Sequence, residues 1–243
     1  MAHSSPLVGI LAPMTSELRP IVRAGHLVRA ADRRAHTGTA GSGDPVRVVA
    51  TLAGIGFASA TASAERLLTD HRPDHVVVVG IAGGIAPDLS IGDVIVPDRV
   101  IDGVTGTEYH PAPLGALARA GTIVSFDGLS TDPDEVARLV AAGGLALDME
   151  SSAVAAVCER HRTPWSVVRS ISDRVGIEPV DDDVLGLARP DGSPDLGAVA
   201  RFVVSHPRRL PGLIRLGRYS TQAANAAAGA ALAGCATVAS PAP

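Results

Sequence analysis

The feature that most constrains the fold is a run of four valines, Val76–Val79, followed at once by the glycine-rich segment Gly80–Gly84. Four consecutive β-branched residues bounded by turn residues predict a strand buried on both faces, as in the middle of a parallel sheet. Open α/β sheets bind ligands at the carboxyl ends of such central strands, where a glycine-rich turn lets the ligand come close. We therefore expect the binding site to form at Gly80–Gly84.

The composition favours an α/β fold. With 243 residues, the chain is long enough for one large domain. Aromatic residues make up only 2%, so the core must be built from Val, Leu, Ile and Ala, which favours an α/β sandwich over an aromatic-rich β-sandwich. The formal net charge of −4 excludes a global positive field, and the scarcity of aromatic residues argues against a stacking platform, so we expect no nucleic-acid partner.

The cysteines and the amino terminus predict a soluble protein of the reducing cytoplasm. Cys158 and Cys235 lie far apart and fit neither a disulfide framework nor a metal-binding pair, so no metal site is expected. The start, Met1–Pro6, lacks the charged and apolar regions of a signal peptide. No uninterrupted apolar run approaches the roughly 18 residues that a membrane span needs.

Apolar runs and turn residues predict the remaining elements. Strands are expected at Leu7–Ala12, Val46–Leu52, Gly92–Pro97, Thr122–Phe126, Leu145–Asp148 and Pro164–Ile171. Helices are expected from a cap at Thr15 or Ser16 to Ala24, after Gly56, and over Glu150–Arg160. The Pro-, Asp- and Gly-rich segment Gly176–Asp195 predicts a loop.

Four acidic residues lie beside glycine turns or strand ends: Glu17, Asp148, Glu150 and Asp173. Two carboxyl groups at the mouth of a sheet can divide the work of catalysis, because one stays protonated as an acid while the other is ionised and orients water or binds hydroxyls. Each residue also has a structural explanation, since Glu17 and Glu150 suit helix N-termini and Asp173 can cap a turn. The combination of the four favours the catalytic interpretation.

Four blocks of the sequence resemble those of the purine nucleoside phosphorylase superfamily: Leu7–Leu18, Val76–Val96, Leu147–Ala156 and Val167–Val175. Within that superfamily, the chain most resembles the 5′-methylthioadenosine/S-adenosylhomocysteine nucleosidases. The resemblance implies a three-layer α/β/α sandwich around a mixed, largely parallel sheet. It also implies a nucleoside substrate, no cofactor, and a homo-oligomer, with a dimer favoured.

The resemblance implies a role for each matching residue. Asp173 matches the acid that donates a proton toward N7 of the purine, and Ser172 helps to hold the base or that acid. Glu150 matches the carboxylate that binds the ribose hydroxyls, while Met149 packs against the sugar. Glu17 matches the general base that positions the attacking water.

The same transfer completes the candidate site. Arg169 lies near the attacking water and joins the catalytic set. The substrate-binding set also includes Met14, Ile81, Ala82 and Gly83. Ile81 stands where these nucleosidases usually have Ser or Thr, and neither Gly176–Asp195 nor the stretch after Ser125 keeps the family's aromatic residues. The sequence therefore does not identify the residues that surround the 5′ substituent.

Hydrolysis is favoured over phosphorolysis. Phosphorylases of this superfamily carry an arginine just before the glycine-rich segment, where it holds phosphate by charge-assisted hydrogen bonds. This chain has Val76–Val79 there. An ionised Glu17 in the same pocket would also repel phosphate, so water is the expected nucleophile.

The segment from His206 differs in composition, because arginines interleave with aliphatic residues before an Ala-rich stretch. One interpretation is an ordinary surface helix with a frayed end, and the other is a basic amphipathic helix that touches anionic lipid. We accordingly divide the chain into a catalytic domain, residues 1–205, and a C-terminal helix with its tail, residues 206–243. Arg189–Gly192 and His206–Arg218 resemble the hopanoid-associated branch of the superfamily.

Three alternative functions remain beside hydrolysis of a small 5′-substituted adenosine. The hopanoid-associated resemblance implies removal of adenine from adenosyl-hopane. A true purine nucleoside phosphorylase would use phosphate in place of water. A non-catalytic nucleoside-binding protein could share the fold, because a fold does not determine a function.

Overall fold

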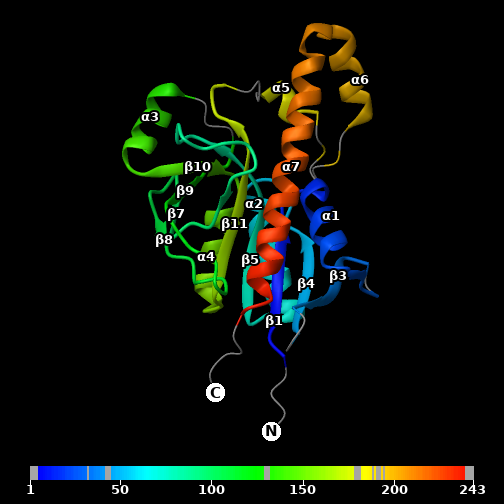
Figure 1. Cartoon of the computed structure of the whole chain (residues 1–243), viewed down its shortest axis with the longest axis vertical. Helices are drawn as coiled ribbons and strands as arrows, with labels where there is room; N and C mark the ends of the chain where they lie inside the picture. The colour runs from blue at the N-terminus through cyan, green and yellow to red at the C-terminus, as the bar shows by residue number, and fades with distance from the viewer. Residues whose placement is uncertain are drawn as a thin grey trace.

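The computed structural model describes residues 5–31, 33–41, 45–128, 132–177, 182–187, 189, 193 and 195–238. Within them, a mixed eleven-stranded sheet lies between two layers of helices (Figure 1). Helices α2 (Phe57–His71) and α4 (Ser151–His161) pack on one face, and α1 (Thr15–Ala24) and α7 (Leu210–Cys235) pack on the other. The expected three-layer α/β/α sandwich is confirmed.

The strands run in the order β2-β3-β4-β1-β5-β10-β9-β7-β8, and β11 pairs with both β5 and β6. Their bounds are β1 (Leu7–Ala12), β2 (Val28–Arg29), β3 (Ala35–Ala40), β4 (Val46–Leu52), β5 (His75–Gly84), β6 (Val94–Ile95), β7 (Arg99–Asp102), β8 (Glu108–Tyr109), β9 (Thr122–Ser125), β10 (Gly144–Asp148) and β11 (Trp165–Arg174). Strand β5 pairs in parallel with β1 and β11, and its carboxyl end pairs with β10 in the antiparallel sense. It is therefore the central strand of the sheet.

The four valines of β5 behave as predicted. Val76 and Val78 pack among the side chains of α2 and α4, whereas Val77 and Val79 pack against α1 and α7. All four are at most 1% exposed. Because both faces of the strand are covered by helices, all four positions of the run hold apolar side chains.

The glycine-rich segment forms a strand rather than the expected turn, since β5 continues through Gly84. Glycine is required here for close approach. A Cβ atom on Gly80 would overlap Glu17 Oε1 and lie 2.5 Å from Arg169 Nη1. On Gly83, a Cβ atom would lie 3.3 Å from Asp173 Oδ2. The missing side chains thus make room for the charged groups of neighbouring elements.

The expected cap of the first helix was wrong. Met14, not Thr15 or Ser16, is the N-cap of α1. The Glu17 carboxylate accepts a hydrogen bond from the Met14 backbone N–H at 2.7 Å, so the helix start is held by a side chain one turn further on. Strands β2, β3, β7 and β8 were not expected, nor were α3 (Pro133–Ala141), α6 (Leu196–Ser205) and the 3₁₀ helix η1 (Pro207–Arg209).

The segment Gly176–Asp195, expected to be a loop, contains a short helix, α5 (Asp182–Leu185). Residues 178–181, 188, 190–192 and 194 lie outside the described part of the chain, as do Leu129 and Ser130 of the stretch after Ser125. Asp195, the last residue of this segment, is the N-cap of α6, and its side chain accepts hydrogen bonds from backbone N–H groups in the first turn of that helix.

The Ala-rich stretch is not the frayed tail that we expected, because it forms the carboxyl half of α7 as far as Cys235. Ala223, Ala227 and Ala231 are completely buried against the sheet. Pro211 does not interrupt this helix, since it lies in the first turn, where a missing N–H leaves no bond unmade. Residues 239–243 lie outside the described part. Among the described helices, none combines the length and the apolar character needed to span a bilayer.

Candidate active site

A cavity of about 290 Å³ opens at the carboxyl ends of β5, β10 and β11 and beside the first turn of α1. All ten residues expected from the sequence line it: Met14, Glu17, Ile81, Ala82, Gly83, Met149, Glu150, Arg169, Ser172 and Asp173. The structure therefore brings together residues that are spread over more than 150 positions of the chain.

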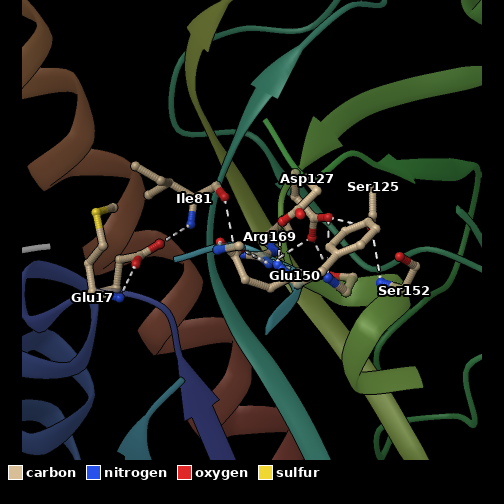
Figure 2. Close-up of polar contacts among 12 residues, drawn as sticks. Glu17, Ile81, Ser125, Asp127, Glu150, Ser152 and Arg169 are labelled. Atoms are coloured by element: carbon tan, nitrogen blue, oxygen red, sulfur yellow. Dashed lines mark hydrogen bonds and ion pairs between the residues drawn. The ribbon is translucent and has the colours of Figure 1, made fainter. Parts of the chain in front are cut away.

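Arg169 on β11 is the centre of the charged part of the cavity, and its side chain is 1% exposed. Its Nη2 atom lies 2.7 Å from Asp148 Oδ2 and donates to Glu150 Oε2 at 3.0 Å. Nη1 donates to the Ile81 carbonyl at 3.3 Å. Figure 2 shows this guanidinium between Ile81 and Glu150. Burial works to lower the pKa of Arg169, but the surrounding carboxylates outweigh it and raise this pKa, so the arginine stays charged.

Glu17 reaches the cavity from α1 and is 2% exposed. Its two carboxylate oxygens accept hydrogen bonds from the backbone N–H groups of Met14 and Ile81, each at 2.7 Å (Figure 2). Burial raises the pKa of Glu17 to about 7, and the nearby Arg169 opposes part of that shift. A carboxyl group with a pKa near neutrality can accept and release a proton, as a general base must.

Glu150 precedes α4 and faces Arg169 from the other side. Its Oε1 atom accepts from the backbone N–H of Gly56 at 3.2 Å, at the start of α2. The next N–H group, that of Phe57, donates to Asp127 at 2.7 Å. Burial raises the pKa of Glu150, while Arg169 lowers it. The helix start and the guanidinium together stabilise a carboxylate in this buried position.

Asp148, at the end of β10, holds Arg169 in place. It accepts hydrogen bonds from Ser125 Oγ at 2.5 Å, from Ser151 Oγ and from the Ser151 backbone N–H. Ser125 Oγ in turn accepts from the Ser152 N–H at 3.0 Å. The sequence singled out Asp148 as an acidic residue at a strand end, but it gave no sign of this contact with Arg169.

Ser172 and Asp173 lie across the cavity, where β11 departs from regular pairing with β5. The register shifts between Ile171 and Asp173, so Ser172 is the extra residue of a β-bulge. Ser172 Oγ donates to Asp173 Oδ1 at 2.6 Å. Bulges redirect side chains and are common beside active sites. Here the bulge sets a hydroxyl and a carboxyl group side by side at the cavity wall.

Comparison with known proteins identifies the family. A family model described as the Phosphorylase superfamily matches residues 7–120 and 112–199. The chain belongs to this superfamily. The expectation from the four sequence blocks is thereby confirmed.

Relatives within the Phosphorylase superfamily carry the nucleosidase name. A 5′-methylthioadenosine/S-adenosylhomocysteine nucleosidase of Marinomonas sp. (strain MWYL1) is 34% identical over 161 residues, which cover 54% of this chain and 70% of the relative. A nucleosidase of the same name from Chromohalobacter salexigens is 31% identical over 203 residues, covering 70% and 86%. The resemblance to the nucleosidase branch is thus confirmed.

Solved structures share the fold. The 5′-methylthioadenosine/S-adenosylhomocysteine nucleosidase of Neisseria meningitidis, in complex with methylthio-immucillin-A, aligns with a TM-score of 0.69 at 18% identity and covers 96% of this chain and 100% of that one. The futalosine hydrolase of Helicobacter pylori aligns with a TM-score of 0.67 at 17% identity and covers 96% and 98%.

This superfamily member has cavity residues that the sequence did not indicate. Leu216 and Ser220 of α7 and Val184 of α5 line one part of the cavity, together with Ile55 and Val175. The C-terminal segment was interpreted separately from the catalytic part, so its contribution to the wall was missed. The aliphatic residues interleaved with the arginines of that segment were the sequence feature that could have indicated a buried side of this helix.

Charge decides what the cavity can hold. Among its described lining residues, Arg169 is the only basic one, against the acidic residues Glu17, Asp148, Glu150 and Asp173. Among all described residues, no group of three or more His, Cys, Asp or Glu is arranged to hold a metal ion. The site therefore suits a neutral or cationic organic ligand whose hydroxyl groups can donate to carboxylates.

Proposed function

We propose that this protein hydrolyses the N-glycosidic bond of a 5′-substituted adenosine and releases adenine. One observation carries the proposal: the same cavity is lined by the paired carboxylates around Arg169 and by the Ser172–Asp173 pair. Such a division of carboxyl groups suits a sugar that becomes cationic while a purine leaves. The nucleosidase relatives support the same reaction.

Each group then has a chemical task. Asp173 donates a proton toward N7 of the purine as the bond from C1′ to the base breaks, and Ser172 orients that carboxyl group. Glu150 accepts hydrogen bonds from the ribose hydroxyls, and its charge stabilises the oxocarbenium-like sugar. A water oxygen attacks C1′, and Glu17 takes its proton. Arg169 holds Glu150 in position.

Water rather than phosphate is the nucleophile in this proposal. Nη2 of Arg169 is already held by Asp148 and Glu150. Four acidic groups line the cavity against this one cation, so a phosphate dianion would meet net repulsion. The superfamily resemblance assigns the phosphate-binding arginine of phosphorylases to the end of the valine run, where Val79 lies buried in the core.

The apolar part of the cavity supports an aliphatic 5′ group on the substrate. Ile55, Val175, Val184 and Leu216 line it, and they suit a thioether or another aliphatic substituent. Methylthioadenosine is our first candidate substrate. A lipid-tailed adenosine, such as the substrate implied by the hopanoid-associated resemblance, is the second, because α7 itself contributes to this apolar wall. The resemblance also supports a homodimer, which sedimentation of the purified protein would test. The free, buried cysteines Cys158 and Cys235 support a location in the reducing cytoplasm.

The test is adenine release from methylthioadenosine, S-adenosylhomocysteine and a lipid-tailed adenosine, each with and without phosphate. We expect phosphate-independent release, reduced by about a hundredfold or more in Asp173→Asn, the typical contribution of a general acid. Asp70→Asn, on the exposed surface of α2, is the matched control and should keep full activity.

Three results would contradict the proposal. Normal turnover by Asp173→Asn would show that Asp173 is not the general acid. Release that depends on phosphate would make the protein a phosphorylase. Tight adenosine binding without any release would make it a binding protein on the same fold.

A further inference from the structure

The charges of the chain are strongly segregated. Residues 196–243 contain five arginines and no acidic residue, whereas residues 1–195 hold the other 16 basic residues and all 25 acidic ones. The C-terminal part therefore has a formal charge of +5, and the remainder has −9. The C-terminal part is therefore positively charged although the chain as a whole is negatively charged.

The basic residues lie on a helical hairpin formed by α6, η1 and the first turns of α7, residues 196–220, which we call the C-terminal hairpin. In Figure 1 it stands beyond the sheet, at the opposite end from the two chain termini. Arg209 stacks over the ring of Phe202 at 5.0 Å and lies 3.8 Å from Asp183. These contacts join η1, the turn of the hairpin, to α6 and to α5.

The remaining arginines of the hairpin, Arg201, Arg208, Arg215 and Arg218, are exposed. Large aliphatic side chains accompany them. Four of the eight large apolar side chains that are exposed among the described residues belong to this hairpin: Leu196, Val204, Leu210 and Ile214, at 76%, 83%, 38% and 57% exposed. Exposed aliphatic residues next to arginines are typical of surfaces that enter the interface of an anionic bilayer.

Helix α7 connects this surface to the cavity. Ile214, Arg215 and Arg218 are exposed, while Leu216 and Ser220 of the same two turns line the cavity wall. A helix that presents one side to the solvent and another to the substrate cavity brings the two within the width of one helix, about 10 Å.

We propose that the C-terminal hairpin docks on an anionic lipid bilayer and places the apolar end of the cavity next to the membrane, so that adenosines with an apolar 5′ chain enter from the lipid. Docking is independent of the hydrolysis proposed for the cavity, whereas the entry of substrate from the lipid depends on it. Each arginine contributes a modest free energy of attraction to the anionic headgroups. The aliphatic side chains enter the boundary between headgroups and acyl chains.

Two other occupants fit the surface less well. A nucleic acid would also attract arginines, but the aliphatic side chains would lie against phosphates, and the body with its charge of −9 would repel the polyanion. A second copy of the chain would have to cover a projecting hairpin whose four exposed aliphatic residues are spread over two helices. Of these three occupants, a bilayer best satisfies the charges and the aliphatic groups together.

The first measurement is co-sedimentation of the full chain with vesicles of phosphatidylglycerol and, separately, of phosphatidylcholine. We expect binding to the anionic vesicles alone, weakened by salt. Arg215→Glu/Arg218→Glu should reduce the bound fraction at least about tenfold. Arg66→Glu/Arg72→Glu, which makes the same charge change on exposed positions of α2 and its C-cap, should bind like the wild type.

The second measurement separates docking from catalysis. The arginine variant should cleave soluble methylthioadenosine like the wild type but lose about tenfold or more on an alkyl-tailed adenosine carried in anionic vesicles. If the wild type cleaves neither substrate, the proposed function fails while vesicle binding still decides the docking. Should the double variant not fold, Ile214→Ser removes an exposed aliphatic side chain instead, and a several-fold loss of vesicle binding is expected.

Several outcomes would overturn the docking proposal. Failure of the wild type to bind anionic vesicles would be one, and a loss of binding in the α2 control as large as that in the hairpin variant would be another. Binding of RNA without binding of vesicles would assign the surface to nucleic acid. A change of oligomeric state in the hairpin variants, measured by sedimentation without lipid, would assign it to a second copy of the chain.

Discussion

Arginine meets two opposite environments in this molecule. Arg169 is 1% exposed and contacts Asp148 and Glu150 at 2.7 and 3.0 Å. Arg215 and Arg218 extend into solvent from a hairpin without any acidic residue. In the first environment the charge is fully desolvated, so its position is determined by its partners. In the second the charge stays hydrated and is free to meet an external anion, which separates the catalytic centre from the proposed docking surface.

The sharpest test of this contrast is the same substitution in both places. Arg169→Met should lower the free energy of unfolding by about 3–5 kcal/mol, because it leaves buried carboxylates without their counter-charge. Arg218→Met should change it by less than about 0.5 kcal/mol, since surface substitutions seldom do more. Urea unfolding of both variants measures the difference. Equal losses of unfolding free energy would show that the buried Arg169 contributes no more to stability than the exposed Arg218.

The next comparison adds one methyl group, by a glycine-to-alanine substitution, at the cavity and on the hairpin. Gly80→Ala would push a Cβ atom against Glu17 and Arg169, so we expect kcat/KM for methylthioadenosine to fall by about tenfold or more. Gly217→Ala, on α7, meets nothing within 4 Å and should leave this value unchanged. Full activity of the Gly80 variant would mean that Glu17 and Arg169 can move apart without consequence.

The pH dependence of activity tests the environment of Glu17. Its pKa is raised by burial to about 7, and a general base must be ionised, so kcat/KM should rise about tenfold per pH unit below pH 7 and level off above it. The folded carboxyl holds its proton longer than the unfolded one. Its contribution to stability is therefore complete below the ordinary pKa of 4.5 and is lost as the pH rises through about 7.

The measurement is the kcat/KM profile for a soluble substrate between about pH 5 and 9. Residual activity of Glu17→Gln should lack the rise. A wild-type midpoint near 4.5, the unperturbed value, would show that burial does not control this carboxyl group.

The smallest effect concerns the hairpin helix itself. Gly217 is in the helix interior, with space around it, so Gly217→Ala should raise the free energy of unfolding by about 0.5–1 kcal/mol through the better helix propensity of alanine. Thermal unfolding measures it against the wild type. A loss of stability would indicate that the helix packs against something at this position.

The central architecture was predictable because it depends on local pattern. The valine run identified the middle strand, and the two faces of that strand are buried as expected. The ten candidate site residues could be proposed because they occur in blocks that resemble a family, and all ten line one cavity. The cap of α1 was missed, since Glu17 satisfies Met14 from one turn inside the helix and leaves no capping residue before it.

By itself, the sequence determined the fold class, the central strand and the identity of the acidic candidates, because burial and periodicity are recorded in neighbouring residues. Only the tertiary structure decided that Asp148 holds Arg169, that Ser172 occupies a bulge, and that α7 forms part of the cavity wall. These features join residues far apart in the chain. Their energies come from desolvated contacts that form only when the elements pack together, and no local pattern reports such contacts.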